Sequence, residues 1–277
     1  GAGSSQVNAH QIDTPLSLLQ ARLGADQLIY AKGYDVDLAE DDEALIAEAV
    51  AAAKSAERAI VMVGLPALFE AEGFDRTHLR QPPQLDALVE AVAAANPNTV
   101  VVLSNGAPIE MPWAGKVKAI LEIYLVGQAG AGALVDLLFG TISPSGKLAE
   151  TFPPHLYDSP SQENFASHPR QLVYREGLNV GYRYFITHDK PVLFPFGHGL
   201  SYSQFSYHNA RITSPWSPET RTMQVAVELT NIGECAAAEV VQLYIHDVES
   251  TAYRPERELK GFQKIFLQAG ESQTVSF

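Results

Sequence analysis

The run Ala59-Ile60-Val61-Met62-Val63-Gly64 is apolar at every position and carries no charge. A strand with one solvated face alternates apolar and polar residues, whereas a strand of a parallel sheet is covered on both faces and is apolar throughout. The run therefore predicts a buried parallel strand. Because parallel strands need crossover connections, usually helices, the neighbouring sequence should alternate strands with helices.

The first half of the chain shows this alternation. An Asp13-Thr14-Pro15 start and a closing Gly24 predict a helix between them, since Pro favours the first turn and Gly the end of a helix. The acidic residues from Glu40 to Glu43 suit the N-terminus of a second helix, so we interpret this charge run as capping. The expected helices cover 15–23, 42–58, 84–95 and 128–139, and the expected strands cover 28–31, 59–64, 99–103 and 119–125. The predicted class is α/β, a mostly parallel sheet sandwiched by helices.

The second half has a different texture. Residues 141–204 are rich in Pro, Gly, Ser and aromatic residues and show no sustained periodicity, although Tyr182, Tyr184 and Phe185 alternate as in a half-buried strand. Strand patterns with turn residues between them then cover 205–212, 222–231, 239–246, 258–267 and 274 onward. They predict a small antiparallel sandwich. We divide the chain into an α/β sandwich domain (1–154), a long connecting loop region (155–204) and a partial β-sandwich (205–277).

Composition excludes several classes of function. The 277 residues are 46% hydrophobic, as in a folded protein, and a net charge of −13 disfavours nucleic acid and anionic membrane surfaces as partners. No apolar run approaches the roughly 18 residues that cross a bilayer. The single Cys235 forms no internal disulfide and is expected to be part-buried, and no Cys/His cluster has metal-ligand spacing. We expect no metal and no cofactor; Gly127-Gln128-Ala129-Gly130 lacks the lysine of a phosphate-binding loop.

Two acidic residues lie within a few residues of the end of the 59–64 strand. Glu70 and Glu72 leave the core at the carboxyl end of a parallel strand, which is where ligands bind in open α/β sheets. A carboxylic acid at this edge is suited to general acid/base catalysis. We interpret one of the two glutamates as the acid/base of a glycosidase; the alternative is a solvated acidic loop.

Several longer motifs occur in order along the chain. They are Gly1-Ala2-Gly3-Ser4-Ser5, Glu70-Ala71-Glu72-Gly73-Phe74-Asp75-Arg76, Pro108-Ile109-Glu110-Met111-Pro112-Trp113, Leu138-Phe139-Gly140, Pro144-Ser145-Gly146-Lys147-Leu148 with Thr151-Phe152-Pro153, Val180-Gly181-Tyr182-Arg183-Tyr184, Phe194-Pro195-Phe196-Gly197-His198-Gly199-Leu200-Ser201-Tyr202 and Glu258-Leu259-Lys260-Gly261-Phe262. Together they resemble the C-terminal half of glycoside hydrolase family 3 β-glucosidases, over almost the entire chain.

The resemblance implies an architecture and a partner. Members of this family carry a (β/α)8 barrel, an α/β sandwich and a fibronectin III-like module; the nucleophile is an Asp of the barrel and the acid/base is a Glu of the sandwich. This chain contains no barrel. We therefore expect a fragment, without the first strand of the sandwich and the last strands of the fibronectin III-like module, whose partners are an N-terminal barrel and a β-glucoside or oligosaccharide. A homo-oligomer is possible, and the compartment is left open.

The resemblance also ranks the site residues. Glu70 is the first choice for the acid/base, because some family members carry insertions before the Gly-Asp pair and retain a glutamate that corresponds to it; Glu72 is the second choice. Ser4 is a candidate for contact with the sugar, although turn formation explains its Gly/Ser pentapeptide equally well. Asp75 and Arg76 are expected to form an ion pair that holds the loop. Gln128-Ala129 departs from the Gln-Glu of the family. The resulting hypothesis is a retaining β-glucosidase; the alternatives are a β-xylosidase and a non-catalytic carbohydrate-binding fragment.

Overall fold

The structure is a computed structural model, which describes residues 7–36, 43–71, 73, 75–162, 164–165 and 170–277. Ser4 and Glu72, two of the candidate site residues, lie outside the described residues. The chain divides into two compact units, each described by itself: a first unit of 1–136 with 154–156, and a second unit of 137–153 with 157–277. The domain boundaries predicted at residues 154 and 204 stay a prediction.

A parallel sheet lies at the centre of the first unit. Its strands β1 (Ala59–Gly64), β2 (Thr99–Ser104) and β3 (Ala119–Glu122) pair in the order β1-β2-β3, and both pairings are parallel. The β1–β2 register runs from Ala59 opposite Thr99 to Gly64 opposite Ser104, so both strands end at the same level. A Cβ at position 64 would overlap the Ser104 carbonyl oxygen, and only glycine permits this approach. The predicted parallel sheet is confirmed, but β1 is not covered on both faces as expected: Val61 and Val63 are buried, whereas Ile60 and Met62 are exposed.

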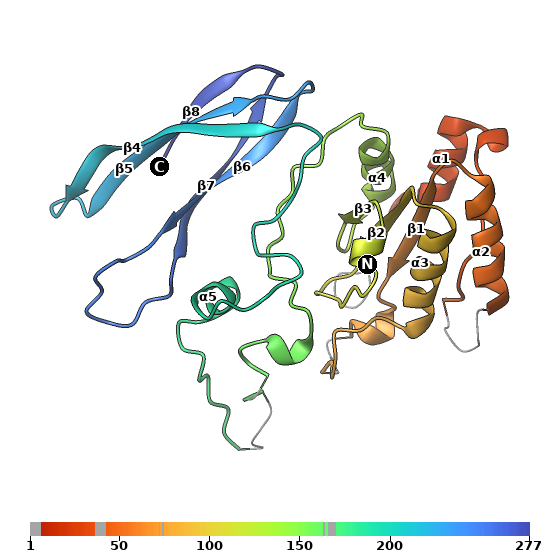
Figure 1. The fold of residues 1–277 in the computed structure, drawn as a ribbon, viewed down its shortest axis with the longest axis horizontal. Coiled ribbons are helices and arrows are strands. Elements are labelled where there is room, and N and C mark those ends of the chain that lie inside the picture. The colour runs from red at the N-terminus through yellow and green to blue at the C-terminus, as the bar shows by residue number, and fades with distance from the viewer. Residues whose placement is uncertain (1–6, 37–42, 72, 74, 163, 166–169) are drawn as a thin grey trace. The chain divides into compact units, whose positions relative to one another are not determined.

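Helices form where the sequence predicted them. They are α1 (Pro15–Leu23), α2 (Glu43–Ser55), α3 (Pro83–Ala95) and α4 (Gly130–Leu138), with the short 3-10 turns η2 (Ala25–Gln27), η3 (Ala67–Phe69) and η4 (Ala114–Lys116). Thr14 and Ser17 cap the start of α1 reciprocally, and Gly24 ends it with φ of 83°. Helices α2 and α3 lie side by side, and α3 contacts β1 and β2 (Figure 1). The buried face of α3 carries Leu85, Leu88, Val89 and Val92.

Trp113 anchors the loop after β2 to helix α3. Its side chain is fully buried, and its indole N–H donates to Asp86 Oδ1 over 2.7 Å. Gln81 Nε2 donates to the same oxygen, also over 2.7 Å. Burial raises the pKa of Asp86, although these two hydrogen bonds act in the opposite direction. Trp113 is therefore a packed aromatic of the core.

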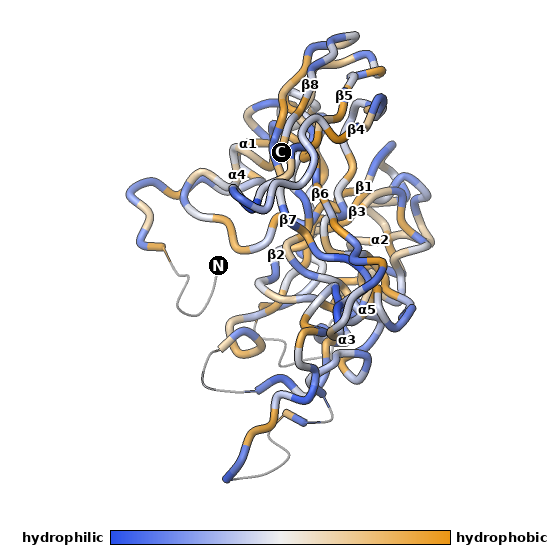
Figure 2. The backbone as a smooth tube through the Cα atoms, turned by 90° about the vertical axis from the view of Figure 1, so that its left-hand side faces the viewer, coloured by the Kyte–Doolittle hydropathy of each residue, from blue (hydrophilic) through white to orange (hydrophobic). Residues whose placement is uncertain are grey.

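The second unit contains two antiparallel sheets. Strands β4 (Phe205–Ser217), β5 (Thr222–Asn231) and β8 (Ser272–Ser276) form one, in the order β4-β5-β8, and β6 (Ala237–Ile245) pairs with β7 (Glu258–Leu267) in the other. Along these strands hydrophobic and hydrophilic residues alternate in short stretches (Figure 2). Apolar side chains of both sheets form one core: Leu229, Val241, Ile265, Leu267 and Val275, with Phe205, Val227 and Phe277 packed against them. The predicted β-sandwich is confirmed.

A buried amide closes one end of this core. Asn231 is fully buried and its Nδ2 donates to the carbonyl oxygens of Cys235 and Leu267, over 2.9 and 3.1 Å. Its Oδ1 accepts from Ser203 Oγ and from the Gly233 N–H. Both polar atoms of the Asn231 amide thus have two partners each, as a buried amide requires.

Three expectations about local structure were wrong. Residues 28–31 form no strand within the described part of the chain; Ile29 and Tyr30 are exposed, so no sheet neighbour covers them. Tyr182 to Thr187 forms the helix α5 and no strand, and Tyr182 and Phe185, three residues apart, share one face of it. Cys235 is a free, exposed thiol.

None of the helices within the described residues is both long and apolar enough to cross a bilayer.

The Trp113 contact yields a stability prediction. Trp113→Phe removes the N–H that pairs with Asp86 and leaves unfilled volume in the core, so we expect a loss of about 1–3 kcal/mol in the free energy of unfolding. The control is Lys116→Ala, which breaks an exposed ion pair with Glu90 and should cost less than about 0.5 kcal/mol. Urea unfolding measures both. Equal losses in the two variants would contradict this assignment.

Glu150 yields a pH prediction. Burial raises the pKa of Glu150 above its ordinary value of 4.5, so its contribution to stability is complete below pH 4.5 and is lost as the pH rises through the folded-state pKa. Glu150→Gln should therefore gain stability relative to the unsubstituted protein as the pH rises from about 4 to about 7. Melting temperatures across this range test it. Glu219→Gln, at an exposed position, is the control. If the difference in melting temperature between Glu150→Gln and the unsubstituted protein does not change with pH, the expected effect of Glu150 burial is ruled out.

Candidate active site

The ends of β1 and β2 bring two loops to the same edge of the sheet. After Gly64 the chain passes through η3 to Glu70, and after Ser104 it turns at Gly106. The Glu70 carboxylate reaches this second loop, where its Oε1 accepts a hydrogen bond from the Gly106 N–H. Its Oε2 is buried and has no partner among the described residues. Glu70 therefore presents one hydrogen-bonded oxygen and one desolvated oxygen at the carboxyl edge.

Arg76 holds the other end of the Glu70 loop. Its Nη1 donates to the Pro108 carbonyl oxygen over 3.2 Å. Burial lowers the pKa of Arg76, and the nearby carboxylates of Glu70 and Glu110 act in the opposite direction. Its Nη2 is buried without a partner among the described residues. Both ends of the loop thus contact the segment that follows β2.

The expected ion pair between Asp75 and Arg76 is absent from the described residues. Asp75 is exposed, whereas Arg76 is half-buried and turned toward Pro108. Arg76 instead contacts a backbone carbonyl oxygen, that of Pro108.

The sequence did not single out two further polar residues near this edge. Asn105 directly follows β2, and Glu122 is the last residue of β3. Asn105 is fully buried, and its Nδ2 donates to the Ala107 carbonyl oxygen over 2.9 Å and to Glu122 Oε2 over 3.1 Å. Glu122 Oε1 accepts from the Tyr124 N–H over 2.8 Å. The available signal was a polar residue at or directly after the end of each of the apolar strands β2 and β3.

A further acid–base pair lies in the same unit. Glu110 Oε2 lies 3.2 Å from His155 Nδ1, and the Glu110 N–H donates to the Leu79 carbonyl oxygen. Throughout the described part of the chain, no group of three or more His, Cys, Asp or Glu residues is placed to hold a metal ion. The carboxylates and backbone amides described at this edge are suited to proton transfer.

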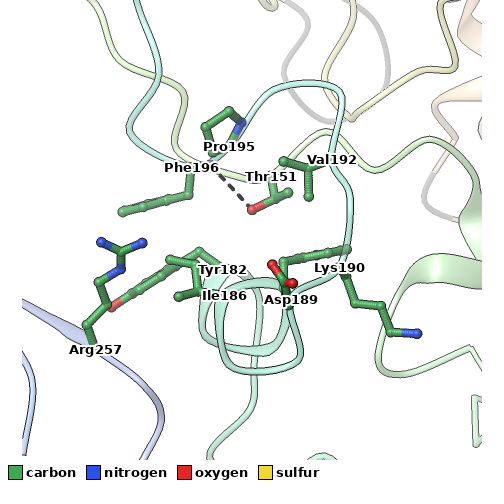
Figure 3. A pocket seen from close by; sticks show the side chains of 10 residues that line it. Thr151, Tyr182, Ile186, Asp189, Lys190, Val192, Pro195, Phe196 and Arg257 are labelled. Atoms are coloured by element: carbon green, nitrogen blue, oxygen red, sulfur yellow. Dashed lines mark hydrogen bonds between the residues drawn. The ribbon is translucent and has the colours of Figure 1, made fainter.

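The second unit has a hollow of its own (Figure 3). Its volume is about 210 Å³, and Tyr182 stacks on Phe196 in its wall with ring centroids 4.6 Å apart. Of the lining residues, all of which are described, Asp189 is the one acid, facing a cavity that also has Lys190 and Arg257 in its wall. Ligands of open α/β sheets bind at the carboxyl ends of the parallel strands, so the sheet edge of the first unit is the better candidate for catalysis.

Comparison with known proteins identifies the family. Residues 1–202 match the model of the glycosyl hydrolase family 3 C-terminal domain, and residues 239–277 match that of a fibronectin type III-like domain. The chain belongs to glycoside hydrolase family 3. This agrees with the motifs and confirms the resemblance.

Named relatives are similar along the whole chain. Thermostable beta-glucosidase B of Acetivibrio thermocellus is 48% identical over 279 residues, which cover 100% of this chain and 37% of the relative. An exo-alpha-(1->6)-L-arabinopyranosidase of Bifidobacterium longum is 44% identical and is covered to 36%. The crystal structure of a GH3 beta-glucosidase of Bifidobacterium adolescentis superimposes with a TM-score of 0.93 at 44% identity, over 99% of this chain and 40% of that one. The chain thus spans well under half the length of these relatives.

The close approach of Gly106 to Glu70 yields a prediction. A Cβ at position 106 would lie 3.2 Å from Glu70 Oε1 and 2.9 Å from Leu125 Cδ1, so Gly106→Ala should push the carboxylate off the amide. Losing a hydrogen bond to a charged group costs about 1.5–3 kcal/mol, which urea unfolding can measure. Gly115→Ala is the matched control, since nothing lies within 4 Å of a Cβ there. If Gly106→Ala and Gly115→Ala lower the free energy of unfolding equally, the contact between Gly106 and Glu70 does not contribute measurably to stability.

Proposed function

We propose that this chain supplies the general acid/base of a retaining β-glucosidase, and that the Asp nucleophile belongs to a (β/α)8 barrel. The observation that supports this most is the position of Glu70: a carboxyl at the carboxyl edge of a parallel sheet, held by the Gly106 amide, with Oε2 desolvated. Glu70 is the first candidate for the acid/base. Glu72, outside the described residues, is the second, and Ser4 is proposed to contact the sugar.

The chemistry requires two carboxyls about 5–5.5 Å apart across the sugar. The nucleophile attacks the anomeric carbon while the acid/base protonates the departing glycosidic oxygen. A water molecule then attacks the glycosyl–enzyme intermediate, and the same carboxylate, now a base, removes its proton. With Glu70 as the acid/base, Arg76 and the Gly106 N–H orient the carboxyl, and activity depends on the barrel that completes the pair.

The proposed substrates carry a terminal non-reducing β-D-glucosyl residue. The names of the Acetivibrio and Bifidobacterium adolescentis relatives support this class. A second candidate is an α-L-arabinopyranoside, because the Bifidobacterium longum relative carries that activity in its name. This sugar presents its leaving group with the same geometry as a β-D-hexopyranoside and lacks the exocyclic CH2OH group. Hydrolysis of aryl β-D-glucoside, β-D-xyloside and α-L-arabinopyranoside by the complete enzyme ranks these candidates.

Glutamine substitutions in the complete enzyme test the acid/base assignment. Glu70→Gln should slow the hydrolysis of substrates with poor leaving groups roughly 10²–10⁴-fold, because the departing oxygen is no longer protonated. Activated aryl glucosides need no such protonation, so their glycosylation step should change little. Azide should accelerate their turnover and yield the β-glucosyl azide, since it attacks the intermediate without a base.

The matched variants are Glu72→Gln and Glu57→Gln, the latter at an exposed position before the amino end of β1. Dependence on the leaving group together with azide rescue in Glu72→Gln alone would move the assignment to Glu72. Absence of this behaviour in both loop variants would refute the proposed role of the loop. Glu57→Gln should behave like the unsubstituted enzyme.

A further inference from the structure

We propose that Asn105 and Glu122 are positioning residues for the acid/base step. They fix residues 105–110, here called the anchoring segment, on which both ends of the 70–76 loop are held. This inference rests on the proposed function, because it assigns a purpose to the rigidity of a segment that bears no reacting group. Neither Asn105 nor Glu122 is proposed to touch the sugar.

The loop is held at both ends by groups of the anchoring segment. Glu70 accepts from the Gly106 N–H at one end, and Arg76 donates to the Pro108 carbonyl oxygen at the other. Both contacts use backbone atoms of the segment, so the position of the loop follows the path of the segment's backbone. The segment in turn needs side chains that fix that path.

The side chains of Asn105 and Glu122 fix the backbone path of the anchoring segment. The Asn105 Nδ2 donates within the segment, to the Ala107 carbonyl oxygen, and across to Glu122 Oε2. The first bond closes a tight turn around Gly106, and the second ties that turn to the end of β3. The orientation of the Gly106 N–H, and with it the Glu70 carboxylate, is thereby coupled to a buried amide–carboxylate pair.

The Glu122 carboxylate is held by the backbone at Tyr124, which has a strained conformation. Its Oε1 accepts from the Tyr124 N–H, and Tyr124 has a φ of 53°, in the left-handed region that disfavours a residue with a side chain. The Tyr124 carbonyl oxygen accepts from Ser104 Oγ over 3.0 Å. Such strain persists only where the surrounding contacts over-determine it, and it is concentrated at functional sites.

The Asn105 side chain also has an unused acceptor. Its Oδ1 is buried and has no partner among the described residues, although the residue is fully buried. An unpaired buried acceptor opposes folding, so Asn105 is a poor choice for stability alone. Local choices that conflict with stability are expected at functional sites, which favours a positioning role over a purely structural one.

The test exchanges the roles of the amide and the carboxylate. Asn105→Asp places a carboxylate oxygen opposite the Ala107 carbonyl and the Glu122 carboxylate, which should repel and displace the segment. Glu122→Gln keeps the side-chain shape and gains an N–H donor. In the double variant Asn105→Asp/Glu122→Gln, the amide introduced at position 122 donates to the carboxylate introduced at position 105. The link between the segment and β3 is thereby restored with its direction reversed.

All variants are assayed in the complete enzyme, on glucosides with poor and with activated leaving groups. Misplacing a catalytic group by about 1 Å can cost about 100-fold, so Asn105→Asp should lower kcat for poor leaving groups roughly 10–100-fold with KM nearly unchanged. Activated substrates should lose less than about threefold, because their departure needs little protonation. The double variant should recover most of the loss.

Asn98→Asp is the matched control. Asn98 is an exposed amide just before the amino end of β2, and its Nδ2 donates to the Glu57 carbonyl oxygen, so the substitution adds the same charge away from the loop. It should leave both substrate classes unchanged. Equal losses on both classes in Asn105→Asp, or a double variant no better than the single one, would overturn the positioning role.

Different outcomes refute the positioning role of Asn105 and Glu122 and the proposed acid/base function. If Glu70→Gln or Glu72→Gln shows the acid/base behaviour and Asn105→Asp does not share the dependence on the leaving group, the positioning role alone is wrong. If neither glutamine variant shows it, the proposed function is wrong and the positioning role falls with it.

Discussion

The in-register parallel pairing of β1 with β2 is the constraint on which the candidate site depends. Because Gly64 lies opposite Ser104, both strands end at one level and their loops leave from the same edge. Glu70 and Gly106 are 36 positions apart in the sequence, yet this register lets the carboxylate reach the amide. A shift in register would separate the two loops and move Arg76 away from Pro108. The glycine at position 64 protects the register, since any side chain there would overlap Ser104.

Elements with a clear period were predictable from the sequence. The apolar run 59–64 is β1 without any change of bounds, and the capping residues of α1 gave both of its ends. Tyr182 to Phe185 was not predictable, because two aromatic residues three apart fit a short helix as well as an irregular strand. Residues 28–31 have strand-like side chains, but a strand needs a pairing partner, which no local pattern supplies.

The candidate site was predictable only in part. Two acids shortly after an apolar strand direct attention to the carboxyl edge of the sheet, since that rule depends on the strand alone. The contacts of Glu70 and Arg76 depend on a segment 30 or more positions further along, and adjacency in the sequence wrongly suggested Asp75 as the partner of Arg76. Asn105 and Glu122 carry no motif, and their role emerges only when β2 and β3 lie side by side.

The chemistry and the fold agree with membership of glycoside hydrolase family 3. The unit with the parallel sheet contains the candidate acid/base, and the second unit contributes a closed apolar core and a fully hydrogen-bonded Asn231. The chain covers 37% of Thermostable beta-glucosidase B, so a division of catalytic carboxyls between this chain and a barrel fits the lengths of its relatives. In our proposal, residues 105–110 set the position of the loop that carries the candidate acid/base.

The most direct test of the central claim is a distance. A crystal structure of the complete enzyme, trapped with a 2-deoxy-2-fluoroglucosyl group on its nucleophile, locates both catalytic carboxyls at once. We expect the Glu70 carboxyl to lie about 5–5.5 Å from the labelled carboxylate, as a retaining mechanism requires. A Glu70 carboxyl more than about 10 Å away, with a different carboxyl at the retaining distance, would contradict it.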